Sequence, residues 1–205
     1  MTEPTSSLSE HDVERDPVRQ FARWFQQAKA SGLAMPEAMA LASASADGGP
    51  SVRMVLLKEF DDRGFVFFTN YESRKGRELE ANPRAALLFH WDPPGRQVRV
   101  EGAVERVSAE ETAAYVRSRP RGSQLSALAS PQSQTIESRA ELEQRVGELE
   151  ARFAGVELPL PESWGGFRVA VEAVEFWQQR EDRLHDRVSY RREPGGTWTI
   201  ERLAP

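Results

Sequence analysis

Residues 52–70 carry the sequence VRMVLLKEFDDRGFVFFTN, in which two runs rich in β-branched and aromatic residues flank the polar segment Asp61-Asp62-Arg63-Gly64. Such runs on either side of a short turn that ends in glycine are typical of an antiparallel β-hairpin. A second hairpin is predicted from residues 85–91 and 97–107, which flank Asp92-Pro93-Pro94-Gly95. The two hairpins predict a chain built mainly of antiparallel strands.

The rest of the chain adds strands and helices to these hairpins. Further strands are predicted at residues 38–45, 167–177, 187–191 and 198–203. Helices are predicted at 16–31, 73–81 and 108–119, each after a capping signal: Asp16 before Pro17, Ser73, and Ser108 with Glu111 in a capping box. A further helix is predicted from 138 onward, with an apolar stripe of Leu142, Val146, Leu149 and Phe153, whereas 121–135 is polar and has no predicted element.

No strand–helix–strand alternation and no GxGxxG motif occurs, which argues against a dinucleotide-binding fold. The pattern predicts a mainly β fold, a small barrel with peripheral helices, in a single domain over residues 15–205. Residues 1–14 are polar and are expected to form a disordered tail.

Composition excludes several classes of function. The 205 residues have a net charge of −5, which argues against nucleic-acid binding, and no cysteine is present for disulfides or metal ligation. His11, His90 and His185 lack the spacing of a zinc site, so no metal is expected. No apolar run approaches the roughly 20 residues needed to cross a bilayer, and the N-terminus lacks a signal-peptide pattern. We therefore expect a cytoplasmic protein.

Basic residues gather in short segments, of which Arg183-Leu184-His185-Asp186-Arg187 is the most distinctive. If this segment is extended, Arg183, His185 and Arg187 lie on one face of a strand. Like charges at such spacing repel one another unless an anion lies between them. The segment is therefore predicted to contact a negatively charged ligand.

Two further basic segments lie near the first hairpin. Alternation places Arg53 and Lys58 on opposite faces of a regular strand, so either they serve two anions or Lys58 lies where the strand ends. Arg74 and Lys75 follow the helix cap Ser73, in the first turn, where the helix dipole disfavours cations. A bound anion at this helix N-terminus would remove the conflict. Ordinary solvated charges are the alternative for both segments.

The segment YVRSRPRGS, residues 115–123, combines a phenol, guanidinium groups and hydroxyls. Tyr115 and Arg119 lie on one helical face, and Ser123 follows the proline that ends the helix. With a nearby lysine they predict a phosphate cage, and the alternative is an ordinary basic helix end. The segment 130–133 carries neutral hydrogen-bonding groups that suit a ligand, but polar residues are also typical of loops. Trp177 either forms the wall of a site for a flat aromatic ligand or is a core residue.

Taken together, these segments closely resemble the pyridoxamine 5′-phosphate oxidase family, and the resemblance covers nearly all of residues 16–205. The matching stretches, in order, are RMVLLK, FFTN with SRK, RQVRVEG, YVRSRPRGSQ, SPQS, WGGFRV, EFWQ, RLHDR and RLAP. Each stretch is a weak signal by itself, whereas the ordered set is specific. The resemblance implies an FMN-binding split β-barrel that forms a homodimer, with two FMN sites at the subunit interface.

The same resemblance implies the residues of each site. FMN would contact Arg53, Met54, Val55, Leu56, Leu57, Lys58, Phe68, Thr69, Arg74, Lys75, Gln97, Gln132, Ser133, Trp177 and Arg187. The substrate phosphate would lie among Lys58, Tyr115, Arg119 and Ser123, with Arg183, Leu184 and His185 beside the substrate ring. Arg183 would orient the substrate and favour negative charge developing on it, and His185 would hydrogen-bond the substrate rather than act as an obligatory base.

The implied reaction oxidises the C4′ carbon of pyridoxine or pyridoxamine 5′-phosphate to give pyridoxal 5′-phosphate. Dioxygen is the final acceptor and hydrogen peroxide a product, and the amine substrate also releases ammonia. The protein mainly has to stack and position two rings. One departure is the segment Ser9–Arg15, which is short, acidic and without tyrosine, whereas some members carry a basic, tyrosine-containing lid there.

The sequence leaves three other functions open. A related flavin oxidase could act on another reduced ring, such as a phenazine precursor, although such a substrate does not need the YVRSRPRGS cage. A carrier could bind pyridoxal phosphate or flavin without catalysis, which the absence of peroxide release would reveal. A deazaflavin-dependent reductase on the same barrel is the third alternative.

Overall fold

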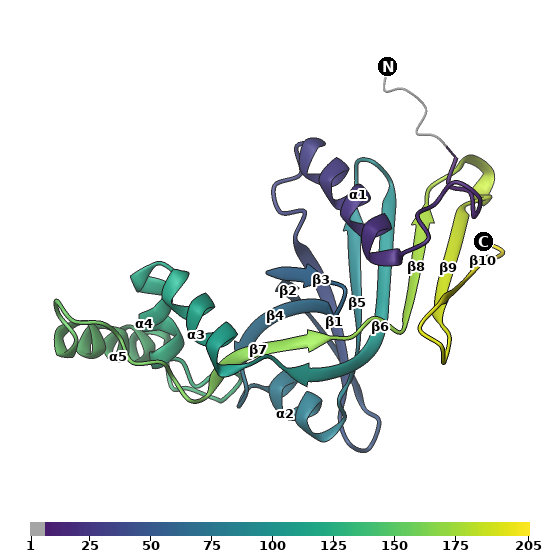
Figure 1. Ribbon diagram of the computed structural model, residues 1–205. Coiled ribbons are helices and arrows are strands. Elements are labelled where there is room, and N and C mark those ends of the chain that lie inside the picture. Colours follow the sequence, from purple (N-terminus) through teal and green to yellow (C-terminus); the bar gives the residue numbers. More distant parts are fainter. Residues whose placement is uncertain (1–6) are drawn as a thin grey trace.

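The computed structural model describes residues 7–205 (Figure 1). Ten strands occur in this part of the chain, and every pairing between them is antiparallel. The strands are β1 (Ala38–Ala44), β2 (Pro50–Leu56), β3 (Glu59–Asp61), β4 (Gly64–Asn70), β5 (Arg84–Trp91), β6 (Arg96–Arg106), β7 (Trp164–Val169), β8 (Ala173–Gln178), β9 (Asp186–Arg192) and β10 (Trp198–Arg202). The predicted hairpins correspond to β3–β4 and β5–β6.

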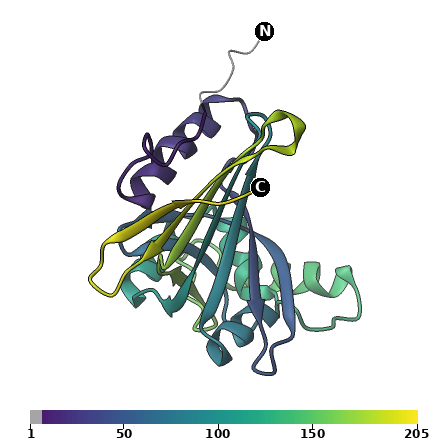
Figure 2. The same cartoon turned by 90° about the vertical axis from the view of Figure 1, so that its right-hand side faces the viewer.

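The sheet curls around β6. The first half of β6 pairs with β5 and β8. Its last residues, Val104–Arg106, pair with β7, which in turn pairs with β4 (Figures 1 and 2). A Cβ atom at Gly102 would overlap the carbonyl oxygen of Ala170, so glycine allows the close crossing of backbones where β6 changes partner. The result is a half barrel with helices at its periphery, which confirms the predicted fold class.

Two of the predicted strands are each divided in two. The run 52–60 breaks after β2, and the backbone N–H of Lys58 donates to the Val66 carbonyl at 2.9 Å, so Lys58 lies in the connection to β3. The run 167–177 breaks at residues 170–172, where the chain passes from β7 to β8. Both predictions of one continuous strand were wrong because a change of pairing partner leaves no mark on apolar alternation.

The core lies between the sheet and α1 (Pro17–Ala30), which covers one end of it in Figure 1. Asp16 caps this helix as predicted, accepting a 2.7 Å hydrogen bond from the Val18 N–H. Phe21 is fully buried and contacts Phe65 and Phe89 with ring centroids 4.7 and 4.9 Å apart. Aromatic burial of this kind joins the helix to both hairpins.

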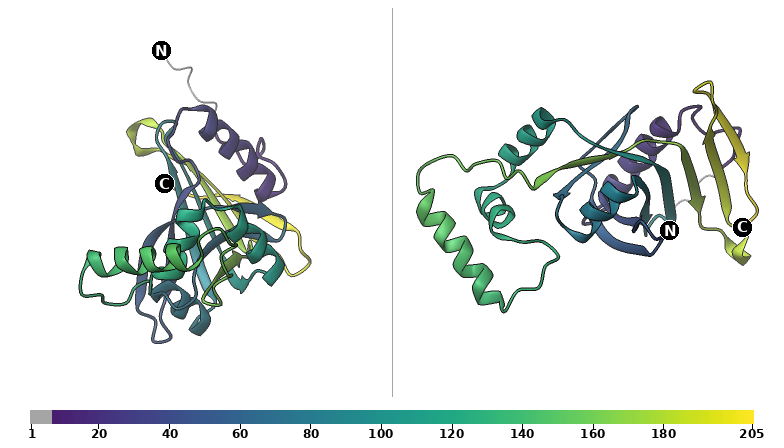
Figure 3. Two further views of the ribbon diagram at one scale, coloured as in Figure 1. Left: turned by 90° about the vertical axis from the view of Figure 1, so that its left-hand side faces the viewer. Right: turned by 90° about the horizontal axis from the view of Figure 1, so that it is seen from below.

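Three helices extend from the other end of β6 and β7. They are α3 (Ala109–Ser118), α4 (Arg121–Ala129) and α5 (Arg139–Arg152), and α4 and α5 project to the side (Figures 1 and 3). Helix α4 occupies a segment predicted to have no element, because one turn of apolar residues is too short to show periodicity. The predicted stripe of α5 is only half-buried, and no residue of that helix is buried.

The expected disordered tail is contradicted for residues 8–14, whereas residues 1–6 lie outside the described residues. Leu8 is buried, and its N–H donates to Asp186 at 3.2 Å. The Tyr190 hydroxyl donates to the Glu14 carbonyl at 2.7 Å. A few specific contacts therefore order a segment whose composition alone predicts disorder. No helix in residues 7–205 is long and apolar enough to cross a bilayer.

Candidate functional site

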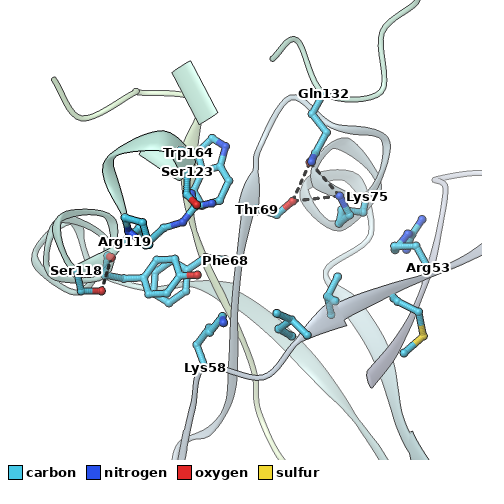
Figure 4. Close-up of a pocket in the computed structure, with 15 residues that line it drawn as sticks. Arg53, Lys58, Phe68, Thr69, Lys75, Ser118, Arg119, Ser123, Gln132 and Trp164 are labelled. Atoms are coloured by element: carbon cyan, nitrogen blue, oxygen red, sulfur yellow. Dashed lines mark hydrogen bonds between the residues drawn. The ribbon is translucent and has the colours of Figure 1, made fainter. Parts of the chain in front are cut away.

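A cavity of about 620 Å³ opens between β2, β4 and the α3–α4 region (Figure 4). The residues that line it include twelve that were predicted to contact FMN or the substrate phosphate: Arg53, Met54, Val55, Leu56, Lys58, Phe68, Thr69, Lys75, Tyr115, Arg119, Ser123 and Gln132. Ser118, Pro120 and Trp164 also line it. These three were not among the predicted site residues, although they fall within the quoted motifs YVRSRPRGSQ and WGGFRV. One cavity thus gathers most of the residues expected to bind FMN and a phosphate.

One end of the cavity is centred on Lys75, in the first turn of α2 (Arg74–Ala81). Its ammonium group donates to Thr69 and Gln132, both at 3.1 Å (Figure 4). Burial lowers the pKa of Lys75, and the positive charge of Arg53 lowers it further. The two cations, Arg53 and Lys75, favour a bound anion at this end of the cavity. Such an anion would also offset the unfavourable position of Lys75 in the first turn of a helix.

Arg53 is held by the buried carboxylate of Glu78, which was not among the predicted site residues. Glu78 accepts hydrogen bonds from Arg53 at 3.0 Å, from Arg74 at 2.8 Å, and from Ser43 and Ser51 at 2.6 and 2.5 Å. Burial opposes ionisation of Glu78, but these four donors outweigh it and lower its pKa to about 2. The spacing of four between Arg74 and Glu78 was the signal available in the sequence.

Replacing Glu78 with glutamine is expected to reduce the free energy of unfolding at neutral pH by up to about 3 kcal/mol. Because the folded pKa of about 2 lies below the ordinary 4.5, Glu78 stabilises the fold above pH 4.5 and loses that effect as the pH falls towards 2. Urea denaturation at several pH values should therefore show the two proteins converging in acid. The control is Glu80→Gln, which removes an exposed pair with Arg106; a constant difference at every pH would contradict the role of Glu78.

The other end of the cavity carries the predicted phosphate cage. The Tyr115 ring stacks on Phe68 with centroids 3.8 Å apart, and the Arg119 guanidinium lies 4.4 Å from the centre of the Trp164 ring. Nη1 of Arg119 is buried and has no hydrogen-bond partner in the described chain. Burial raises the pKa of Tyr115, against the opposing charge of Arg119, so its hydroxyl is a donor at neutral pH. This end offers donors to an anion.

Lys58 belongs to this second end rather than to the end that holds Arg53. Its ammonium group lies 6.0 Å from the centre of the Tyr115 ring, and Lys58 is the second residue after the end of β2. Figure 4 shows Lys58 and Arg119 on one side of the cavity and Arg53 and Lys75 on the other. Of the two possibilities that the sequence left open, the structure confirms that Lys58 lies beyond the strand end. The cations also lie on two sides of the cavity, and their service of two anions stays a prediction.

Other predicted site residues lie outside this cavity. Leu57 is buried in the core, Arg74 is turned to Glu78, and Ser133 follows Gln132 with a left-handed φ of 70°. Gln97, Trp177 and Arg187 occupy paired positions across β6, β8 and β9. This second group lies on β6, β8 and β9, and β8 and β9 are at the opposite side of Figure 1 from α4 and α5.

The prediction that Arg183, His185 and Arg187 share a strand face was wrong. Arg183 ends a single 3₁₀ turn and has a φ of 61°, and β9 begins only at Asp186. Arg187 already binds Glu175 through two hydrogen bonds of 2.7 and 3.1 Å. Alternation applies only to regular strand, so the inference of mutual repulsion does not hold for this segment.

Two regions of the chain match models of known protein families. Residues 25–153 match the family model described as pyridoxamine 5′-phosphate oxidase, and residues 164–205 match that of the pyridoxine 5′-phosphate oxidase C-terminal dimerisation region. The chain belongs to the pyridoxamine 5′-phosphate oxidase family. Within this family, proteins named pyridoxine/pyridoxamine 5′-phosphate oxidase from Rubrobacter xylanophilus and Salinibacter ruber are 58% and 54% identical to it. Each alignment covers 98% of this chain, and 92% and 94% of the respective relative.

Solved structures agree with the family fold. PhzG from Burkholderia lata 383, determined in complex with tetrahydrophenazine-1-carboxylic acid, has a TM-score of 0.91 at 33% identity, covering 98% of this chain and 99% of that one. An FMN-binding protein of Nostoc punctiforme related to pyridoxamine 5′-phosphate oxidase has a TM-score of 0.74 at 16% identity, covering 94% of this chain and all of the other. The second likeness concerns the fold alone.

Proposed function

We propose that this protein is an FMN-dependent oxidase that converts pyridoxine 5′-phosphate or pyridoxamine 5′-phosphate to pyridoxal 5′-phosphate. Dioxygen is reduced to hydrogen peroxide, and the amine substrate also releases ammonia. The observation that carries the proposal is one cavity with two separate cationic ends, Arg53 with Lys75 and Lys58 with Arg119. Two phosphorylated molecules, a cofactor and a substrate, match these two ends.

The residues at the first end fit the phosphate of FMN. Lys75 and Arg53 supply charge, Thr69 supplies a hydroxyl, and Glu78 holds Arg53 in place. The neighbouring apolar side chains of β2, Met54 to Leu56, line the cavity beside them and suit a flat ring. FMN, when bound, supplies the acceptor for the two electrons that the substrate loses.

The residues at the second end fit the phosphate of the substrate. Arg119 is held over Trp164, with one nitrogen that has no hydrogen-bond partner in the described part of the chain. Lys58, Tyr115 and Ser123 line the same part of the cavity. Charge-assisted hydrogen bonds to a dianion favour this arrangement, and they fix the distance of the substrate ring from the first end.

The second group of residues is proposed to reach the cavity from a partner subunit. The outer face of β2 exposes Val52 by 69%, Met54 by 65% and Leu56 by 37%, and the last two also line the cavity. An apolar face of this kind at the mouth of a site favours coverage by another chain. The dimerisation region named by the family model spans the strands that carry Trp177 and Arg187. We therefore propose a homodimer with two FMN sites at the interface.

An absorption spectrum of the purified protein tests the proposed function. The flavin bands are expected to bleach when pyridoxine 5′-phosphate is added without oxygen, and to return in air with release of peroxide. A protein that cannot be reconstituted with FMN would contradict the cofactor, and would favour a carrier or a deazaflavin enzyme. Flavin that stays oxidised with both B6 phosphates would contradict the substrate.

A second candidate substrate is a reduced phenazine-type ring, because the PhzG structure is similar over almost the whole chain. The cationic end at Arg119 favours a phosphorylated substrate over such a ring, which carries no phosphate. Under the same anaerobic conditions, bleaching by a dihydrophenazine carboxylic acid and none by the B6 phosphates would reverse this preference.

A further inference from the structure

The loop between β8 and β9 carries Arg183, Leu184 and His185, and its conformation is unusual. Asp182 and Arg183 both have left-handed backbones, with φ of 54° and 61°. Leu184 is 70% exposed, and residues 181–184 are exposed throughout. A left-handed non-glycine residue costs energy, so neighbouring contacts must hold the loop in this shape.

Asp186 makes the contacts that hold the end of this loop. Its carboxylate accepts hydrogen bonds from Arg180 at 2.6 Å, from Arg202 at 3.0 Å and from the backbone N–H of Leu8 at 3.2 Å. These donors come from the start of the loop, from β10 and from the N-terminal segment. The hydrogen bond between Arg180 and Asp186 therefore joins the two sides of the exposed turn.

His185 is fixed by the same structure. The backbone N–H of Arg180 donates to Nδ1 of His185 at 3.1 Å, and the ring lies 4.6 Å from that of Trp177. A neutral imidazole has one protonated nitrogen, and the nitrogen that accepts a hydrogen bond is the unprotonated one. The proton of neutral His185 therefore lies on Nε2, which has no hydrogen-bond partner among residues 7–205.

We propose that Asp186 is a positioning residue for the oxidation: by holding Arg180 it keeps the Arg180 N–H against Nδ1 of His185, so that His185 offers Nε2–H to the substrate as a hydrogen-bond donor. The proposal rests on the proposed function, in which His185 lies beside the substrate ring. His185 in this form orients an acceptor atom of the substrate and does not remove a proton from it. Asp186 acts only through Arg180 and the loop.

The tautomer can be measured without any turnover. Long-range proton–nitrogen NMR spectra of the uniformly ¹⁵N-labelled, FMN-loaded protein distinguish a protonated from an unprotonated ring nitrogen. The chain has only three histidines, so comparison with His185→Gln assigns the signal. We expect unprotonated Nδ1 and protonated Nε2 at a pH where the ring is neutral. A proton on Nδ1 would overturn the proposal, whatever substrate the enzyme uses.

Substitution of Asp186 tests the positioning role. Asp186→Ala is expected to give a mixture of His185 tautomers and to lower kcat/KM by about tenfold or more with unchanged FMN content. Asp186→Asn keeps an acceptor oxygen and should restore part of both, and if the alanine variant does not fold, this variant decides. The matched control is Glu201→Gln, which removes an exposed pair with Arg191 on the same two strands.

Two results would overturn the assignment of Asp186: an unchanged tautomer in the variants, or a mixed tautomer with wild-type kcat/KM. Failure of the proposed function is distinguishable, because an enzyme inactive on B6 phosphates would still report the His185 tautomer by NMR. The tautomer thus tests whether Asp186 holds the loop that orients His185. The kinetics test whether the Nε2–H donor of His185 contributes to the reaction.

Discussion

Replacing Arg119 with alanine is expected to raise the KM for pyridoxine 5′-phosphate by about 10- to 100-fold while the FMN content of the purified enzyme stays unchanged. The expected range corresponds to the roughly 1.5–3 kcal/mol of a charge-assisted hydrogen bond. Nη1 of Arg119 is buried without a hydrogen-bond partner among residues 7–205, and the guanidinium rests on Trp164 at the end of the cavity proposed to bind the substrate. Its loss removes binding at that end and leaves the Lys75 end intact.

Steady-state kinetics and flavin absorbance measure the two effects separately. Arg117→Ala is the matched control, because Arg117 lies two residues away on the same segment and forms an exposed pair with Glu157. That variant should behave as the wild type. If Arg119→Ala bound substrate normally, or if it lost FMN instead, Arg119 would not belong to the substrate phosphate site.

Heterodimers that combine an Arg119→Ala subunit with an Arg183→Ala subunit are expected to recover about half of the wild-type kcat/KM. Arg183→Ala alone should lower kcat/KM by at least about tenfold, or roughly 1.4 kcal/mol. If each site joins the cavity of one protomer to the loop of its partner, one of the two sites in the heterodimer is free of both substitutions. That site should work normally.

Two different affinity tags allow the heterodimer to be purified away from both homodimers. The two homodimeric variants give the baseline, and doubly tagged wild type gives the upper limit. Activity no higher than the baseline would mean that each site is built from a single chain, contrary to the proposed interface. Arg191→Ala controls for loss of an arginine on β9, at the end of the strand away from the loop, because Arg191 pairs only with exposed Glu201 in the described chain.

Local signals in the sequence were enough for most elements of the fold. Asp16 before Pro17 predicted the start of α1, and Ser108 with Glu111 predicted the capping box that opens α3. The turn at Asp61–Gly64 predicted the β3–β4 hairpin. Each of these depends on residues within a few positions of one another, so neighbouring side chains carry the whole signal.

Predictions failed where pairing between distant strands decides the conformation. Alternation favoured one strand over 167–177, but the contact with Gly102 and the switch of partner from β4 to β9 divide it. The expectation of a shared face for Arg183 and His185 required an extended segment, whereas a turn occurs there beside the contacts of Asp186 with Leu8 and Arg202. Local patterns cannot report such contacts.

The sequence by itself determined the hairpins, the helix starts, the family and the residue types of the two basic groups proposed to bind phosphate, because hydrophobic period, caps and ordered motifs are properties of short segments. Only the tertiary structure decided that Lys58 joins Arg119, that Glu78 holds Arg53, and that the Gln97–Trp177–Arg187 group lies apart from the cavity. These relations depend on how the sheet curls around β6, which brings together segments far apart in the chain.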